Sequence, residues 1–367
     1  MRLARPVAVA AAAFTAVALT ATPASAAPND PLYADQYGPQ QVRAEQAWAT
    51  STGAGAVIAV VDTGVDLSHE DLAGKLVAGA TFVDCGTTSC GNGDYRGPNG
   101  VNDNDEHGTH VAGIAAAATG NGVGIAGVAR DAKIMPVKVL EDGSGSFEDI
   151  ALGIRWAADH GADVVNLSLG ALQGVQALVI TGVITDVQDA IAYANSKGVA
   201  VIAAAGNDSV PICNEPAFDA GAMCVSATDK REAPAAYSSG TVKPDLMSVS
   251  APGGSLLPVC GEDIVSTVPA GTSSAGETCG YGNNYDEYAG TSMATPHVAG
   301  VAALLAAQGR SVQNIYDTLM ATARTPGSTA RGVYTTQYGW GIVDAEAAVA
   351  APGAAVTTTK KRGARKG

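Results

Sequence analysis

Six short, largely apolar segments constrain the fold of this chain more than any other feature. They are Val57–Val61, Ile134–Leu140, Val164–Leu169, Val199–Ala204, Met223–Ala227 and Met247–Ala251. Such segments are typical of strands that are buried on both faces of a parallel sheet. Between them lie helical patterns at Thr109–Ala118, Phe147–His160, Asp186–Lys197 and Pro296–Gln308. This alternation predicts one α/β domain over residues 27–350, with a mostly parallel sheet and helices on both faces.

Polar residues stand at the ends of three of these segments. Asp62 follows the first, Ser168–Gly170 closes another, and Asn207 follows a third after Ala205 and Gly206. The working groups of such sheets gather at the carboxyl ends of the strands. We therefore expect the three segments to meet at a single functional rim.

Ser292 lies in the sequence Gly290-Thr-Ser-Met-Ala-Thr-Pro-His-Val-Ala-Gly300, which leads into a run of small apolar residues typical of a buried helix. Backbone N–H groups in the first turn of a helix have no intrahelical partner, so they can stabilise negative charge that develops beside a hydroxyl. Serine is also a common helix cap. This segment alone leaves both interpretations open.

Four residues together supply what peptide hydrolysis by a hydroxyl requires. Ser292 would be the nucleophile, His107 the base that takes its proton, Asp62 the acid that orients the base, and Asn207 a donor to the oxyanion. Each has an ordinary alternative: Asp62 and Asn207 as turn residues, and His107 with His110 as zinc ligands. The His-Gly-Thr-His sequence lacks the spacing of a helical zinc-protease motif. The order Asp, His, Asn, Ser is hard to obtain by chance.

With these motifs the chain resembles the subtilisin-like serine proteases, or subtilases, and especially their thermitase-like members. The resemblance covers roughly Asn29 to Val343 and also rests on Asn29-Asp-Pro31, Gln36–Gln40, Asp71–Lys75 and Val301–Arg310. It implies a single subtilisin-like domain and a secreted serine endopeptidase. It further implies an Asp62, His107 and Ser292 triad, an acyl-enzyme intermediate, and an oxyanion hole made by Asn207 and the Ser292 N–H, with His110 structural.

Two other classes of protein remain as alternatives. One is a binding protein that keeps the fold without turnover, which the presence of all four competent residues disfavours. The other is an esterase or lipase, whose Gly-x-Ser-x-Gly motif and Ser, Asp, His order are absent from this chain.

The resemblance also implies a groove that binds extended protein or peptide substrates with broad specificity. The backbone segments that would pair with the peptide are Gly143, Ser144, Gly145 and Ser168, Leu169, Gly170. Phe147 would border a distal apolar pocket. An insertion, Leu172–Asp186, lies beside the primary specificity pocket and leaves its preference open.

A structural Ca²⁺ ion is the cofactor that the resemblance implies. Its ligands would be the side chains of Asp30, Asp71 and Asn121 and the carbonyls of Ala118, Val123 and Ile125. Hard oxygen ligands suit Ca²⁺, although two acids in an acidic protein can also be ordinary surface residues. Asp84, Asp94, Asp103 and Asp105, in the loop before His107, are weaker candidates for a second ion.

The N-terminus is typical of a secretory signal peptide over residues 1–26, cleaved after Ala26. It has a basic start, an apolar run at Val7–Leu19 and the sequence Ala24-Ser-Ala26. That run is too short for a membrane anchor. We therefore expect a secreted, extracellular protein with no stable membrane anchor. Because only the stretch from Ala27 to Asp62 separates the expected cleavage site from the first motif, we expect no separate pro-domain. Residues 351–367 are expected to form a basic, disordered tail.

Charge and cysteine content are consistent with export. The formal net charge is −14, which argues against nucleic-acid partners. An even number of cysteines in an oxidising compartment predicts disulfides. Of the fifteen pairings that six cysteines permit, we favour the sequence-local one: Cys85–Cys90, Cys213–Cys224 and Cys260–Cys279. We expect a monomer.

Overall fold

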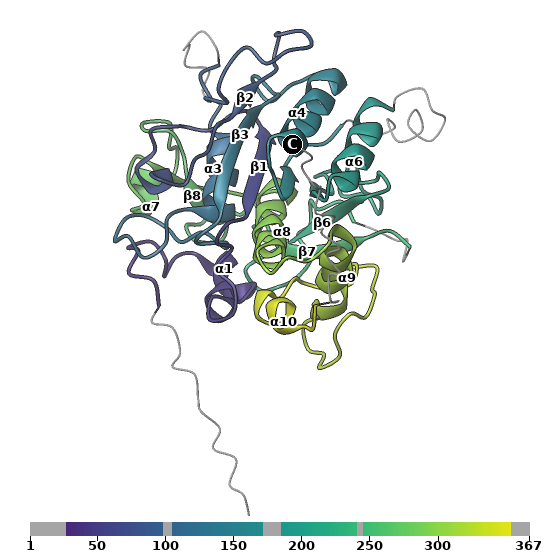
Figure 1. The fold of residues 1–367 in the computed structure, drawn as a ribbon. Helices are drawn as coiled ribbons and strands as arrows, with labels where there is room; N and C mark the ends of the chain where they lie inside the picture. Colours follow the sequence, from purple (N-terminus) through teal and green to yellow (C-terminus); the bar gives the residue numbers. More distant parts are fainter. Residues whose placement is uncertain (1–26, 98–104, 172–184, 241–244, 354–367) are drawn as a thin grey trace, which may run out of the picture.

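The computed structural model describes residues 27–97, 105–171, 185–240 and 245–353, and its centre is a seven-stranded sheet (Figure 1). The strand order is β2-β3-β1-β4-β5-β6-β7, and the pairs are parallel. The strands are β1 (Val57–Asp62), β2 (Ala80–Thr81), β3 (Lys133–Lys138), β4 (Val164–Leu167), β5 (Ala200–Ala204), β6 (Ala222–Thr228) and β7 (Ser248–Pro252). The predicted α/β fold is confirmed.

Helices cover both faces of this sheet (Figure 1). One face carries α3 (His107–Ala116) and α8 (Thr291–Ala306), and the other carries α4 (Phe147–Asp159) and α6 (Asp186–Ser196). Successive side chains of a strand point to opposite faces. Accordingly, Ile58 and Val60 of β1 pack with α3 and α8, whereas Ala59 and Val61 pack with α4 and α6.

Helix α8 runs through the centre of the molecule. It contacts β4, β5, β6 and β7 as well as α3, and every residue from Met293 to Leu305 is buried. A helix that is apolar all round belongs in a core. Ser292 is only partly buried, so the start of α8 is where this central helix reaches the surface.

Smaller elements complete the domain. An antiparallel pair, β8 (Ile264–Thr267) and β9 (Tyr285–Tyr288), packs beside α3. The remaining helices are α1 (Tyr37–Gln41), α2 (Ala44–Ala47), the 3₁₀ turn η1 (Glu70–Leu72), α7 (Gly276–Cys279), α9 (Val312–Thr322) and α10 (Ala345–Ala350). None of the described helices is both long and apolar enough to cross a membrane.

Two predicted strands end earlier in the structure than their apolar pattern suggested. Val139 and Leu140 leave β3, and their N–H groups donate to the carbonyl of Asp62 at 2.9 and 3.3 Å. Ser168 and Leu169 likewise lie beyond the end of β4. These four residues belong to the functional rim and do not pair within the sheet. The apolar pattern of a sequence cannot distinguish these two positions.

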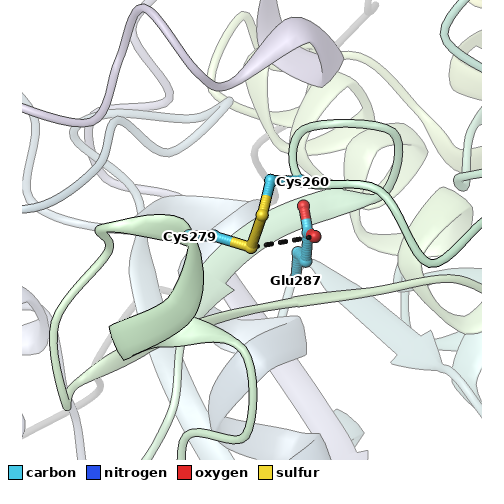
Figure 2. Close-up of side chains that lie close together, drawn as sticks. All are labelled: Cys260, Cys279 and Glu287. Atoms are coloured by element: carbon cyan, nitrogen blue, oxygen red, sulfur yellow. Dashed lines mark hydrogen bonds between the residues drawn. A yellow bond between two sulfur atoms is a disulfide. The ribbon is translucent and has the colours of Figure 1, made fainter.

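The cysteines form the three sequence-local disulfides, Cys85–Cys90, Cys213–Cys224 and Cys260–Cys279. Figure 2 shows the last of these beside Glu287, with the Cys279 Sγ 3.6 Å from Oε1 of Glu287. These three side chains form the one group of three or more His, Cys, Asp and Glu residues at metal-ligand spacing among the described residues. Thiolate is the form of cysteine that binds metal, and a disulfide has none, so this cluster is not a metal site.

The predicted signal peptide 1–26, residues 172–184 of the insertion, Asp103, and residues 354–367 of the predicted tail lie outside the described residues. The proposed domain boundaries therefore stay predictions.

Candidate active site

Asp62 and His107 meet at the carboxyl end of β1. Asp62 is the last residue of β1 and His107 the first of α3. The His107 Nδ1 lies 2.7 Å from Oδ1 of Asp62, and the N–H of Thr63 donates to the same oxygen at 2.7 Å. The Asp62 side chain is fully buried, whereas that of His107 is 33% exposed. With Nδ1 donating to the carboxylate, Nε2 of the neutral ring is an acceptor.

The environment favours the charged form of His107. Burial lowers the pKa of the imidazole, but the charge and hydrogen bond of Asp62 outweigh this, and the pKa lies above its ordinary value. Asp105 and Glu106 add to the same effect. A base whose protonated form is stabilised by a neighbouring carboxylate can both take and return a proton.

The turn after β1 fixes the start of α3. The Thr63 hydroxyl accepts a hydrogen bond from the N–H of Gly108 at 3.0 Å. A Cβ at Gly108 would lie 2.1 Å from the carbonyl oxygen of Gly64, so only glycine permits this approach. The close contact holds His107 against Asp62.

Ser292 is the second residue of α8, and it is bound reciprocally to Ser168. The Ser292 hydroxyl donates to the Ser168 carbonyl at 3.1 Å, and the Ser168 hydroxyl donates to the Ser292 carbonyl at 2.7 Å. That carbonyl is available because Pro296, four residues later, has no N–H to donate within the helix. The proline thus lets the start of α8 attach to the end of β4.

Asn207 is held by the residue before Ser292. Its Oδ1 accepts from the N–H and the hydroxyl of Thr291, at 2.9 and 3.0 Å. The hydroxyl in turn accepts from the N–H of Gly206 at 3.1 Å. With Oδ1 occupied, the Nδ2 group of this exposed side chain lies beside Gly290, where an added Cβ would be 3.5 Å from it. In the described part of the chain the Ser292 N–H donates no hydrogen bond, which leaves two donors at this corner.

A groove of about 780 Å³ lies beside His107. It is lined by His107, by both predicted backbone segments Gly143–Gly145 and Ser168–Gly170, and by Phe147. Ser292 is one hydrogen bond away, through Ser168. Glu215 and Asp219, which belong to no recognisable sequence motif, also line the groove.

A sequence model of the subtilase family matches residues 53–341. The chain belongs to the subtilase family. It is 45% identical over 300 residues to thermitase from Thermoactinomyces vulgaris, an alignment that spans 81% of this chain and 91% of thermitase. It is 37% identical over 365 residues to an extracellular protease of Xanthomonas campestris pv. campestris, which spans 89% of this chain and 57% of that protein.

A solved structure shows the same fold. It belongs to the proteases from Pseudoalteromonas arctica PAMC 21717, with 34% sequence identity and a TM-score of 0.72. The match covers 89% of this chain and 99% of that one. The chain is thus a subtilisin-like serine peptidase.

A buried lysine stabilises the rim of this subtilase. The Lys138 side chain, at the end of β3, is fully buried, and its Nζ donates to the carbonyls of Thr63 and Leu140, both at 2.9 Å. It also donates to Oδ2 of Asp105 at 3.2 Å, and that oxygen accepts from the N–H of Asp142 at 2.9 Å. One ion pair therefore joins the turns after β1 and β3. Its signal in the sequence is a lysine inside an apolar segment.

The second histidine of the motif does not form a zinc site with the first. His110 is fully buried and stacks on Tyr288 with ring centroids 4.4 Å apart. Burial lowers the pKa of His110 to about 3, so the ring stays neutral. The Nδ1 of His107 is engaged by Asp62 instead of by a metal.

The residues predicted to bind calcium lie together. Asp30 and Asp71 are buried, at 4% and 0% exposure. Asp30 accepts from the N–H groups of Gly120 and Asn121, and Asp71 accepts from the Asn121 amide at 2.9 Å and the Ile125 N–H at 2.8 Å. Two buried carboxylates that contact the same loop need a compensating positive charge.

The carbonyls of the same loop have the chemistry of calcium ligands. In the described part of the chain those of Ala118, Val123 and Ile125 accept no hydrogen bond. Unused oxygen acceptors beside two buried carboxylates match the donor set that Ca²⁺ prefers. The residues present therefore fit the ion.

Two of the four candidates for a second ion, Asp94 and Asp105, have other partners. Asp94 forms an ion pair with Arg96 at 2.7 Å, and Asp105 is paired with Lys138. Their charges are already neutralised by side chains, so neither needs a metal.

Proposed function

We propose that this subtilase is a secreted, monomeric endopeptidase with an Asp62, His107 and Ser292 triad. The observation that carries the proposal is the 2.7 Å contact between Asp62 and His107 at a groove whose edge, Ser168, binds Ser292. A carboxylate, an imidazole and a hydroxyl arranged around a substrate groove are the parts that acyl transfer requires.

In the proposed reaction His107 Nε2 takes the proton of Ser292 Oγ as that oxygen forms a bond to the scissile carbonyl carbon. This requires the hydroxyl to turn away from the Ser168 carbonyl. The oxyanion accepts hydrogen bonds from Asn207 Nδ2 and the Ser292 N–H. The imidazolium, stabilised by Asp62, returns its proton to the leaving amine. Water then hydrolyses the acyl-enzyme by the same steps.

The groove supports extended binding with broad specificity. The peptide backbone would pair with Gly143–Gly145 on one side and Ser168–Gly170 on the other, in the manner of an added β-strand. Phe147 supplies an apolar wall farther along. Hydrogen bonds to the peptide backbone do not discriminate between substrate side chains, so selectivity depends on the pockets that hold those side chains.

A structural Ca²⁺ ion belongs to the same proposal. Its ligands would be Asp30, Asp71, Asn121 and the carbonyls of Ala118, Val123 and Ile125. The ion would neutralise two buried carboxylates that, within the described part of the chain, form no hydrogen bond or ion pair with Asp62, His107 or Ser292, so it would act on stability and not on the chemical step.

The proposal is tested by casein hydrolysis with Ser292→Ala, His107→Ala and the double variant. Because the two groups act as a unit, each single change should lower kcat by at least about a thousandfold and the double change little more. Ser196→Ala, on the exposed end of α6, is the matched control and should retain full activity. A folded Ser292→Ala protein with wild-type activity would refute the triad.

A further inference from the structure

The groove contains two buried acids that the proposed mechanism does not use. Glu215 and Asp219 lie between β5 and β6, line the groove, and are 2% and 3% exposed. The carbonyl of Glu215 accepts from the N–H of Ala171 at 2.7 Å. Glu215 therefore lies next to the residue that follows Ser168–Gly170, the segment that is proposed to hold the substrate backbone.

Nothing in the described part of the chain neutralises this pair. No group outside the pair donates a hydrogen bond to either carboxylate oxygen of Glu215 or to Oδ1 of Asp219 there, and the two carboxyl groups are hydrogen-bonded to each other. The described lining residues include no lysine or arginine, but they include two further acids, Asp105 and Glu106. Two adjacent buried carboxyl groups without a cation are unfavourable when both are ionised, so the pocket is suited to a ligand that supplies a positive charge and hydrogen-bond donors.

The surroundings of the pair favour retention of a proton when no ligand is bound. Burial, and then the charge of Asp219, raise the pKa of Glu215, and burial raises the pKa of Asp219. Two adjacent carboxyl groups cannot both ionise easily, so one proton is shared between them. A cationic ligand would displace this proton and restore two negative charges.

A metal ion explains the pair less well than an organic cation. Among the described residues no third His, Cys, Asp or Glu joins the pair at metal-ligand spacing. The neighbouring lining residues Leu169, Val187 and Pro216 are apolar. Apolar walls that lead to two carboxylates match a side chain with an aliphatic stem and a positive end.

We propose that Glu215 and Asp219 bind the side chain of a lysine or arginine of the substrate, so that this peptidase cleaves at a fixed distance from a basic residue. This inference rests on the proposed function and narrows its broad specificity at one position. At the other positions of the peptide, the enzyme binds the backbone and does not select the side chain.

A positional peptide library tests the inference. It varies four residues on each side of the scissile bond and compares lysine, arginine and norleucine, which keeps the stem without the charge. At one position the basic residues should exceed norleucine by at least about tenfold in kcat/KM. This preference should increase as the pH rises, because the carboxyl pair then loses its shared proton.

The variant Glu215→Gln/Asp219→Asn should lose the preference and still cleave the norleucine peptide. Glu215→Gln alone is the milder variant if the double change impairs folding. Glu148→Gln, an exposed acid of α4 beside Phe147, is the matched control and should keep the preference. Cleavage of neutral peptides with no basic preference at any position, or a preference that survives in the double variant, would overturn the inference while supporting the endopeptidase proposal.

If no peptide is cleaved, that result counts against the endopeptidase proposal alone. A binding measurement then tests whether Glu215 and Asp219 bind a cation. Calorimetry on the Ser292→Ala protein would compare n-butylammonium and n-butylguanidinium with 1-pentanol. Binding of the two cations that disappears in the Glu215→Gln/Asp219→Asn background supports the inference. Absence of cation binding overturns it.

Discussion

The contact between Asp62 and His107 determines how activity responds to pH. His107 must be neutral to accept the Ser292 proton, and its pKa is raised by Asp62 despite the opposing effect of burial. Activity should therefore fall as the pH decreases through a value above about 6.5, the ordinary pKa of histidine. For a neutral peptide, we expect the acidic midpoint of the kcat/KM profile to lie above about pH 6.5.

The same coupling can be followed without turnover. In the Ser292→Ala protein, the ring-proton NMR signals of His107 should titrate above about 6.5, and Asp62→Asn should lower the midpoint. Because the folded pKa is raised, the pair stabilises the fold below about pH 6.5, and this contribution is lost as the pH rises through the folded pKa. Equal midpoints in the two proteins would contradict the coupling.

Asn207 allows a second test at the scale of one side chain. Its Oδ1 is held by Thr291, so Nδ2 is the group available to an oxyanion. In subtilisin, a relative of this protein, loss of the corresponding donor costs about 2.7–4 kcal/mol in the transition state. We expect Asn207→Ala to lower kcat by about 10²–10³ with little change in KM.

The control for this variant is Ser209→Ala in the same loop. Its hydroxyl donates to the Ala236 carbonyl at 2.9 Å and lies outside the proposed oxyanion hole. Steady-state kinetics should show it close to wild type. A large rise in KM with unchanged kcat for Asn207→Ala would assign Asn207 to ground-state binding instead.

At the scale of elements, the buried pair of Lys138 and Asp105 joins the ends of β1 and β3 to the start of α3. Removing one partner leaves a buried charge uncompensated, which typically costs about 3–5 kcal/mol. We expect Lys138→Met to lower the free energy of unfolding by about that amount in the Ser292→Ala background. Adding Asp105→Asn should recover part of it.

Chemical denaturation measures this cycle, and an exposed ion pair is its control. Lys197 and Asp159 lie 2.8 Å apart with side chains 45% and 44% exposed. Water and salt screen such a pair, so Lys197→Met should change the free energy of unfolding little. Equal losses for the two lysine variants would show that burial does not govern the Lys138 pair.

At the scale of the whole molecule, the proposed calcium site joins the N-terminal arm to the loop after α3. An ion that binds only the native state adds about 2.7 kcal/mol of stability at one hundred times its dissociation constant. Chelation should therefore lower the melting temperature of the Ser292→Ala protein, and Asp30→Ala with Asp71→Ala should remove the response to chelator.

Asp189→Asn, an acid near the start of α6, is the control for this variant and should melt and respond as the parent does. In the active enzyme, chelation should speed self-digestion because loosened loops are cut first. A melting curve that chelator leaves unchanged would show that no ion stabilises this fold.

Most of the main sheet followed from local patterns. The apolar segments predicted six of its seven strands, and the helical patterns matched α3, α4, α6 and α8 within a few residues. The pair β8 and β9 was not predicted, because the strand Tyr285–Tyr288 contains two acids and has no apolar run. Asp286 of this strand is buried and accepts hydrogen bonds from Ser274. Its neighbours in the sequence indicate neither the burial nor the partner.

The candidate site divides in the same way. Asp62, His107, Asn207 and Ser292 lie in short motifs whose chemistry can be read from adjacent residues, so the sequence alone was sufficient to propose them. Glu215 has no such motif. Its significance comes from burial and from the absence of a neutralising partner among the described residues. The energy of a charge depends on which distant segments surround it, and only the folded chain brings those segments together.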